Sequence, residues 1–149
     1  MGNIEKERLD FLYRISECLK NIEVEHIVFN DCLLSLIRHG NLNAARNRAD
    51  LSIEYGTFKN KTKEIIEALD LLQIGRICIN SLTKWPCITI KCKDFSYRIL
   101  VFKYKDKKNL IYRKRNIYPA NYLNLTRTIN VYGYQLPVPK DSVSFLKEE

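Results

Sequence analysis

The first half of the chain carries three hydrophobic patterns typical of helices. Over residues 5–22, apolar side chains recur at steps of three and four, which predicts an amphipathic helix. A similar stripe predicts a second amphipathic helix over residues 59–72. Between them we expect a short helix over residues 32–38, with Asp31 as its N-cap and Gly40 at its end.

Runs of β-branched and aromatic residues predict strands around these helices. Residues 49–55 alternate with period two, so we expect a half-buried strand with Asp50, Ser52 and Glu54 on its polar face. The other strands are expected at residues 26–29, 76–79, 87–92, 97–104 and 109–112, before a strand pair that turns near Gly133 and a last helix over 143–149. This order predicts one α+β domain over residues 1–149, with a mixed sheet flanked by helices.

Composition narrows the class of protein. The chain has 149 residues, 46% of them apolar, which suffices for one domain with a core and excludes a disordered chain. Charged residues begin at Glu5 and no apolar run is long enough to span a membrane, so we expect a cytoplasmic protein. Five cysteines without C-x-x-C spacing, and two distant histidines, indicate free thiols rather than a zinc site.

The net charge points to anionic partners. The formal charge is +8, and residues 103–115 hold seven Lys and Arg side chains against the single acid Asp106. Such a stretch attracts nucleotides, phosphosugars or nucleic acid, although it is also typical of a solvated hairpin. Tyr104 and Tyr112 lie within it, and stacking aromatics among cations suit single-stranded nucleic acid; tyrosines at this spacing are more often packing residues.

Three segments together resemble the LicD/fukutin family of transferases. Residues 31–40, DCLLSLIRHG, are similar to the family's G-T-L-L-G-x-x-R-H-G, and residues 46–53, RNRADLSI, fall where the family has D-D-D-I-D-I. Residues 131–146, VYGYQLPVPKDSVSFL, resemble its closing V-P-V-P segment and helix, and residues 97–102, YRILVF, lie where it has I-D-I-F. The resemblance implies a nucleotidyltransferase fold and transfer of phosphocholine or ribitol phosphate from a CDP-linked donor to a glycan.

The residues that would carry this transfer are largely replaced. Transfer from a nucleoside diphosphate donor uses a divalent cation such as Mg²⁺, which prefers carboxylate ligands. Carboxylates at i and i+2 of a strand share a face about 7 Å apart, and a third comes from the neighbouring strand. The resemblance places Arg48, Asp50 and Arg98 at these positions, so a single carboxylate remains. We therefore expect no bound metal cofactor, although the family implies Mg²⁺.

The segment that would cradle the donor phosphates is also altered. Where the family has Gly-Thr, this chain has Asp31 and Cys32, and Asp31 adds negative charge where an anion should bind. Arg38 and His39 match the family's Arg-His pair. The resemblance assigns them to the ligand site, whereas helix physics alone makes them cations that complement the C-terminal dipole.

Three functional hypotheses follow. The leading one is a degenerate LicD/fukutin-like pseudoenzyme that acts by binding a protein partner or a phosphate-bearing ligand; Arg48 and Arg98 would either hold phosphate or pair with Asp50. The second is a divergent active phosphotransferase with relocated ligands such as Asp50, Glu54 and Asp94, although Glu54 lies about 13 Å along the strand from Asp50. The third is a basic nucleic-acid-binding domain.

Overall fold

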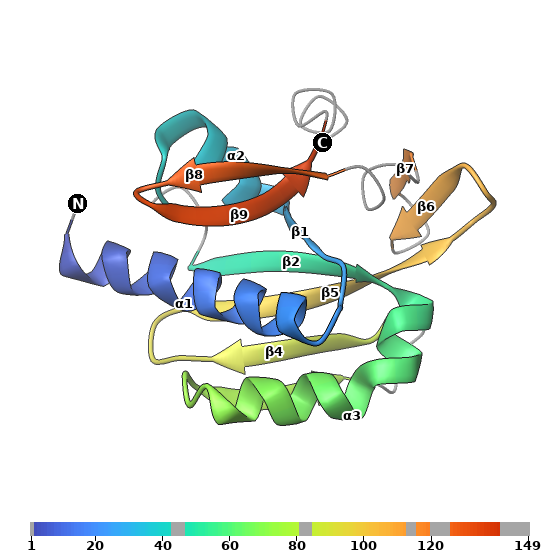
Figure 1. The fold of residues 1–149 in the computed structure, drawn as a ribbon, viewed down its shortest axis with the longest axis horizontal. Coiled ribbons are helices and arrows are strands. Elements are labelled where there is room, and N and C mark those ends of the chain that lie inside the picture. The colour runs from blue at the N-terminus through green and yellow to red at the C-terminus, as the bar shows by residue number, and fades with distance from the viewer. Residues whose placement is uncertain (1, 43–46, 81–84, 113–115, 120–125, 141–149) are drawn as a thin grey trace.

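The computed structural model describes residues 2–42, 47–80, 85–112, 116–119 and 126–140 (Figure 1). Its helices are α1 (Asn3–Asn21), α2 (Asn30–His39) and α3 (Tyr55–Leu71). Its strands are β1 (Ile27–Phe29), β2 (Arg48–Glu54), β3 (Arg76–Asn80), β4 (Cys87–Lys91), β5 (Ser96–Tyr104), β6 (Asn109–Tyr112), β7 (Asn116–Pro119), β8 (Thr126–Val131) and β9 (Tyr134–Pro139).

A seven-stranded mixed sheet forms the centre of the molecule. Its main path is β1-β2-β5-β4-β3, and β6 and β7 continue from the far end of β5. Strands β2 and β5 are parallel, and the remaining strand pairs are antiparallel. The β8–β9 hairpin is a separate sheet that lies against β1 and α1 (Figure 1). The predicted α+β class and mixed sheet are therefore confirmed.

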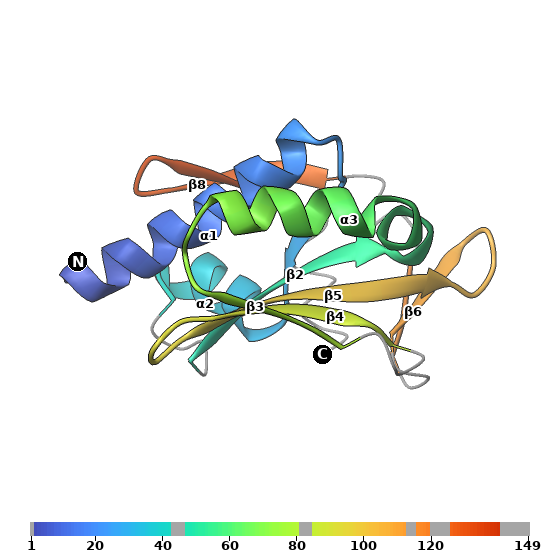
Figure 2. The same cartoon turned by 90° about the horizontal axis from the view of Figure 1, so that it is seen from below.

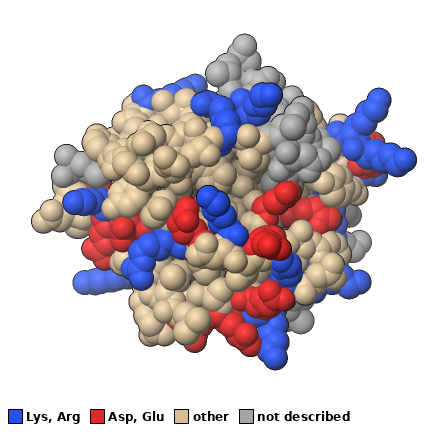
Figure 3. Space-filling model, in the orientation of Figure 1, with Lys and Arg blue, Asp and Glu red and all other residues tan. Residues whose placement is uncertain are grey.

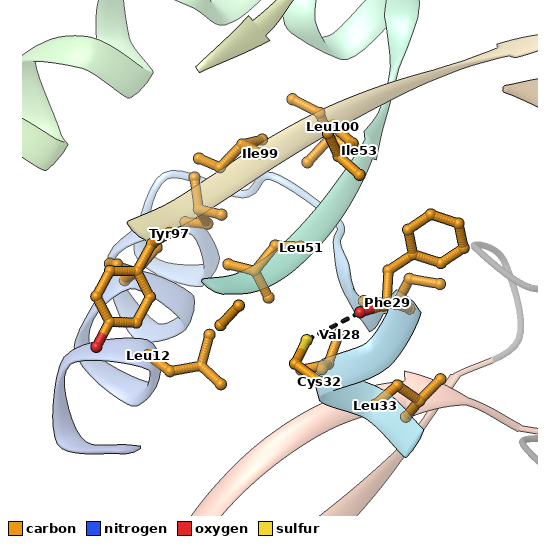
Figure 4. Close-up of a cluster of buried hydrophobic side chains, with 14 of the residues drawn as sticks. Leu12, Val28, Phe29, Cys32, Leu33, Leu51, Ile53, Tyr97, Ile99 and Leu100 are labelled. Carbon is orange, nitrogen blue, oxygen red and sulfur yellow. Dashed lines mark hydrogen bonds between the residues drawn. The ribbon is translucent and has the colours of Figure 1, made fainter. Parts of the chain in front are cut away.

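The helices divide unequally between the two faces of this sheet. Helices α1 and α3 run side by side over one face, and α2 lies on the other (Figure 2). Tyr97 points to the α1 side, where its hydroxyl donates to the Arg8 carbonyl oxygen at 2.8 Å. Leu51 and Ile99 lie on that same face (Figure 4). The predicted apolar stripe of α1 is confirmed, with Leu9, Leu12, Ile15 and Leu19 buried.

Strand β2 corrects the expectation of a half-buried strand. Asp50 and Ser52, expected on an exposed polar face, are 2% and 0% exposed. The reason is position, because β2 is an inner strand between β1 and β5, with helices on both sides of the sheet. Period two distinguishes the two faces of a strand, but it does not show whether a second layer covers the polar one.

All three helices begin earlier in the chain than expected, α1 at Asn3 instead of residue 5, and the starts of α3 and α2 have local causes. Helix α3 begins at Tyr55 rather than at residue 59, because the Glu54 carboxylate accepts the Thr57 amide at 2.9 Å and caps the helix. Helix α2 begins at Asn30 with Phe29 as its N-cap, so Asp31 is a helical residue and not the cap. Gly40 ends α2 as expected, in the left-handed conformation. The helix expected over 143–149 lies outside the described residues.

The other face of the sheet is packed with aromatic rings next to α2. Phe29 on β1 meets Phe102 on β5 edge to face, with ring centres 4.8 Å apart. Tyr112 and Tyr118 stack on Phe102 at 5.3 and 5.6 Å. This cluster joins β1, β5, β6 and β7, which fixes the curled end of the sheet.

The cysteines and the helices bear on two sequence predictions, that of free thiols and that of no apolar run long enough to span a membrane. All five cysteines are free. None of the helices in the described part of the chain combines the length and the apolar character that crossing a membrane requires.

Gly75 marks a close approach between two chain segments. A Cβ atom at this position would lie 2.6 Å from the carbonyl oxygen of Lys91, and backbone cannot yield as a flexible side chain does. We expect Gly75→Ala to lower the free energy of unfolding by about 1–3 kcal/mol, measured by urea denaturation. Gly2→Ala is the control, since a Cβ atom added at Gly2 would have no atom of another segment within 4 Å. Equal unfolding midpoints for the two variants would contradict the observed packing.

Candidate functional site

Parallel pairing of the two central strands brings the predicted site residues together. In the register of β2 and β5, Asp50 lies directly beside Arg98, and Arg48 lies beside Ser96. Residues paired in this way share a face of the sheet. The expectation that Arg98 stands on the strand next to Asp50 is therefore confirmed.

Asp50 and Arg98 form a closed, two-point ion pair. Arg98 Nε donates to Asp50 Oδ1 at 2.8 Å, and Nη2 donates to Oδ2 at 2.9 Å. The Asp50 side chain is 2% exposed and that of Arg98 is 19% exposed. The hydrogen bonds to Asp50 raise the pKa of Arg98, against the opposing effect of burial. Both carboxylate oxygens of Asp50 are thus engaged by one guanidinium.

Arg48 is a looser member of the same group. Its Nε lies 4.0 Å from Asp50 Oδ2, and its side chain is 44% exposed. A pair at this distance and exposure contributes little to stability. Arg48 therefore keeps its guanidinium at the surface beside the Asp50–Arg98 pair.

Cys32 occupies the position where the resemblance expects a phosphate-binding hydroxyl. Its thiol instead makes hydrogen bonds within the fold. Its thiol donates to the Phe29 carbonyl oxygen at 2.8 Å (Figure 4). The Asp50 amide donates to Cys32 Sγ at 3.1 Å, so the thiol ties the start of α2 to β2. Burial raises the pKa of Cys32 to about 12, so the thiol stays protonated at neutral pH.

Arg38 and His39 lie at the opposite end of α2 from Cys32. Both are exposed and occupy the last turn of the helix, just before Gly40. At 1.5 Å per residue, the six residues from Cys32 to Arg38 span about 9 Å. They are placed to complement the dipole of α2, and the Asp50–Arg98 pair adjoins its first turn.

The relocated metal ligands that a divergent enzyme would need are not brought together. Glu54 caps α3, and Asp94 lies in the connection between β4 and β5. Within residues 2–42, 47–80, 85–112, 116–119 and 126–140, no three His, Cys, Asp or Glu side chains form a group that could hold a metal ion. Because Asp50 already accepts two bonds from Arg98, this donor set does not fit Mg²⁺.

The α2 side of the sheet extends over β4 and β3, and we call this part of it the open face. It contributes two cations that the sequence analysis missed, Arg76 and Lys91. Arg76, Lys91, Ser96 and Arg48 form one row across β3, β4, β5 and β2. The three cations of this row are exposed, and the row shares its face with Arg98 and Asp50. The period-two patterns of β3 and β4 contain the signal, since Arg76 and Lys91 alternate with isoleucines.

Charge on the opposite side of the molecule is distributed differently. Over α1 and α3, Asp and Glu side chains intermingle with Lys and Arg (Figure 3). In the two rows around Asp50, four cations stand against one carboxylate: Arg48, Arg76, Lys91 and Arg98 against Asp50. The open face of the sheet therefore favours anions, whereas the α1 and α3 side mixes both signs.

The basic stretch over 103–115 is partly used in packing. Lys103 Nζ lies 4.8 Å from the ring centre of Tyr55 and 4.9 Å from that of Trp85. Tyr112 is 8% exposed and stacks on Phe102, so its ring is not available to a nucleic-acid base, whereas Tyr104 is 45% exposed. Residues 113–115 lie outside the described residues.

Comparison with known proteins identifies the fold. No protein-family model matches the sequence, and no curated protein matches it. The structure is similar to the crystal structure of ANT(2")-Ia in complex with adenylyl-2"-tobramycin, with a TM-score of 0.56 and 10% identity, over 89% of this chain and 69% of that one. It also matches the Cid1 poly(U) polymerase at a TM-score of 0.47 and 17% identity, over 64% of this chain and 30% of that one. The fold is nucleotidyltransferase-like, and this likeness of fold rests on the first match.

Proposed function

We propose that this chain is a degenerate LicD/fukutin-like protein of the nucleotidyltransferase fold that binds a phosphate-bearing ligand without catalysing metal-dependent transfer. The observation that carries the proposal is the two-point ion pair between Asp50 and Arg98. It closes the carboxylate at the position where the resemblance expects a metal site.

The charge of the residues at positions 48, 50 and 98 disfavours metal-dependent transfer. Three carboxylates at residues 48, 50 and 98 would give a formal charge of −3, whereas two arginines and one aspartate give +1. Binding Mg²⁺ at Asp50 would require breaking the bonds from Arg98 and leaving a guanidinium beside the cation. Both steps cost free energy, so the arrangement disfavours the metal.

Neighbouring cations on the open face of the sheet favour an anionic ligand. Arg76 and Lys91 are direct cross-strand neighbours, and like charges so placed destabilise a sheet. An anion bound over these two exposed side chains would offset this repulsion. Arg48 is the exposed guanidinium nearest Asp50, and arginine holds phosphate through paired N–H donors. We assign Arg48, Arg76 and Lys91 as the direct ligand contacts and Arg98 as the residue that holds Asp50.

The resemblance also places Arg38 and His39 at the ligand site. Their position at the far end of α2 makes them outer contacts, reached by a ligand that extends beyond its phosphates. A CDP-linked molecule has that length, so the nucleoside or alcohol portion would lie toward α2 while the phosphates lie over β2–β5–β4.

Calorimetric titration with CDP and with pyrophosphate tests the proposal. In EDTA we expect measurable binding of both, and Arg48→Ala should weaken it about tenfold or more because it removes a charge-assisted contact. Arg38→Ala should weaken CDP binding more than pyrophosphate binding. The matched control is Arg127→Ala, an exposed arginine on the separate β8–β9 hairpin, which should bind like the wild type.

Two results would contradict the proposal. One is binding that appears only when Mg²⁺ or Mn²⁺ is added, which would restore a metal site. The other is turnover of a CDP-linked donor, detected as release of CMP, which would make the chain an active transferase.

A further inference from the structure

A cavity lies between α1 and the β8–β9 hairpin, away from the open face of the sheet that carries Arg48, Arg76 and Lys91. Its volume is about 390 Å³. The residues that line it do not include any of the candidate site residues Arg38, His39, Arg48, Asp50 and Arg98. Ser16 and His26 line it, together with hydroxyl and amide side chains of the hairpin: Thr126, Thr128 and Gln135. The two buried polar residues of this cavity contact each other.

Ser16 and His26 have the geometry of a nucleophile and its base. Ser16 Oγ lies 2.6 Å from His26 Nε2, and His26 Nδ1 lies 2.8 Å from the Val24 carbonyl oxygen. A carbonyl oxygen only accepts hydrogen bonds, so Nδ1 carries the ring proton and Nε2 is a bare acceptor for the Ser16 hydroxyl. A serine, a base within hydrogen-bond reach and a third group that orients the base are the parts of an activated nucleophile.

The histidine is held in the form that can accept a proton. Burial lowers the pKa of His26, and Lys20 on α1 acts in the same direction. The hydrogen bond to Val24 and the charge of Glu17 oppose this effect. Glu23 and Glu25 line the cavity from the segment that holds His26, and the lining side chains of β8 and β9 are uncharged. His26 is therefore neutral at pH 7.

The other buried serines lack this arrangement. Among the described residues, three serines are buried: Ser16, Ser35 and Ser52. Ser35 Oγ donates to the Asn41 carbonyl oxygen at 2.6 Å, and a carbonyl cannot take the proton away. Ser52 Oγ has no hydrogen-bond partner among the described residues. Ser35 is thus a natural control for Ser16.

The lining of the cavity also indicates which substrates it admits. Glu17, Glu23 and Glu25 stand against Lys20, which leaves a formal charge of −2 around the cavity of a chain whose net charge is +8. Anionic substrates are repelled, and neutral or cationic ones are accepted. Thr126, Thr128 and Gln135 line the same cavity from the hairpin, and hydroxyl and amide side chains are of the type that can donate hydrogen bonds to a reacting oxygen.

We propose that this cavity is an acyl-transfer site in which Ser16 attacks neutral or cationic esters with His26 as the base. Ser16 Oγ bonds to the carbonyl carbon while its proton moves to His26 Nε2. The tetrahedral intermediate then expels the alcohol, which takes that proton from His26, and an ester of Ser16 remains. Water, deprotonated by His26, releases the acid and restores the serine hydroxyl.

Labelling of the full chain with sulfonyl fluorides tests the nucleophile. Ser16 Oγ would bond to sulfur, fluoride would leave, and the hydroxyl proton would pass through His26 to solvent. We expect one adduct, mapped to Ser16 by peptide mass spectrometry, with phenylmethanesulfonyl fluoride and with aminoethylbenzenesulfonyl fluoride. The anionic fluorosulfonylbenzoic acid should react about tenfold more slowly than the cationic reagent. Nitrophenyl acetate should acetylate the same residue.

The controls separate a reactive pair from a structural one. Ser16→Ala should lose the adduct and Ser35→Ala should keep it. The wild-type labelling rate should fall as the pH drops below 6.5 toward the lowered pKa of His26, because the protonated ring no longer accepts the serine proton. Absence of label on Ser16, or a labelling rate that does not change with pH over that range, would overturn the proposal; both are read on the wild-type chain.

Discussion

Replacing Arg98 by alanine should lower the free energy of unfolding by about 3–5 kcal/mol. Asp50 is 2% exposed and Arg98 engages both of its carboxylate oxygens, so the variant leaves a buried charge without its guanidinium. Urea denaturation followed by the fluorescence of Trp85, the single tryptophan, measures the change.

The neighbouring arginine provides the matched control. Arg48→Ala removes the same kind of side chain, but Arg48 is 44% exposed and 4.0 Å from Asp50. We expect a change within about 1 kcal/mol. The double variant Asp50→Asn with Arg98→Met should recover part of the loss, because it removes both charges together. Similar unfolding midpoints for Arg98→Ala and Arg48→Ala would contradict the closed ion pair.

Replacing Phe29 by alanine should cost a similar amount, about 3–5 kcal/mol. Phe29 is fully buried and meets Phe102, Tyr112 and Tyr118 edge to face, with ring centres 4.8 to 6.0 Å away. The variant leaves a cavity at the junction of β1, β5, β6 and β7. The same urea experiment measures the loss.

Two further variants serve as comparisons for Phe29→Ala. Phe29→Leu keeps most of the volume and should cost about 1–2 kcal/mol. Leu71→Ala is the exposed control, since Leu71 is 82% exposed, and should change stability by less than about 0.5 kcal/mol. A loss for Phe29→Ala no greater than for Leu71→Ala would show that the aromatic cluster does not hold the end of the sheet.

The sequence predicted the helices, strands and turns better than it predicted which of their side chains are buried. The stripe of α1, the end of α2 at Gly40 and the turn of the β8–β9 hairpin at Gly133 all depend on local spacing or on one glycine with positive φ. The burial of Asp50 and Ser52 depends on which strands flank β2 and on what covers the sheet. That information is spread over the whole chain, so period two alone could not supply it.

For the candidate site, the sequence predicted which residues lie side by side on β2 and β5, but not what their side chains bind or which other strands contribute. Resemblance and strand spacing indicated that Arg98 lies beside Asp50, and the register confirms it. The spacing could not choose between phosphate binding and ion pairing, because that choice depends on rotamers of both side chains. Arg76 and Lys91 were missed since they come from β3 and β4, whose place in the sheet no motif marked. The Ser16–His26 contact joins a helix to the loop before β1, and nothing in the local pattern pairs them.

The most direct measurement is anomalous diffraction at the manganese edge from crystals of the full chain soaked in Mn²⁺ and CDP. The proposal predicts no manganese peak at Asp50, an Arg98 guanidinium still bonded to both carboxylate oxygens, and CDP phosphates beside Arg48. A manganese ion coordinated by Asp50, with Arg98 turned away, would contradict it.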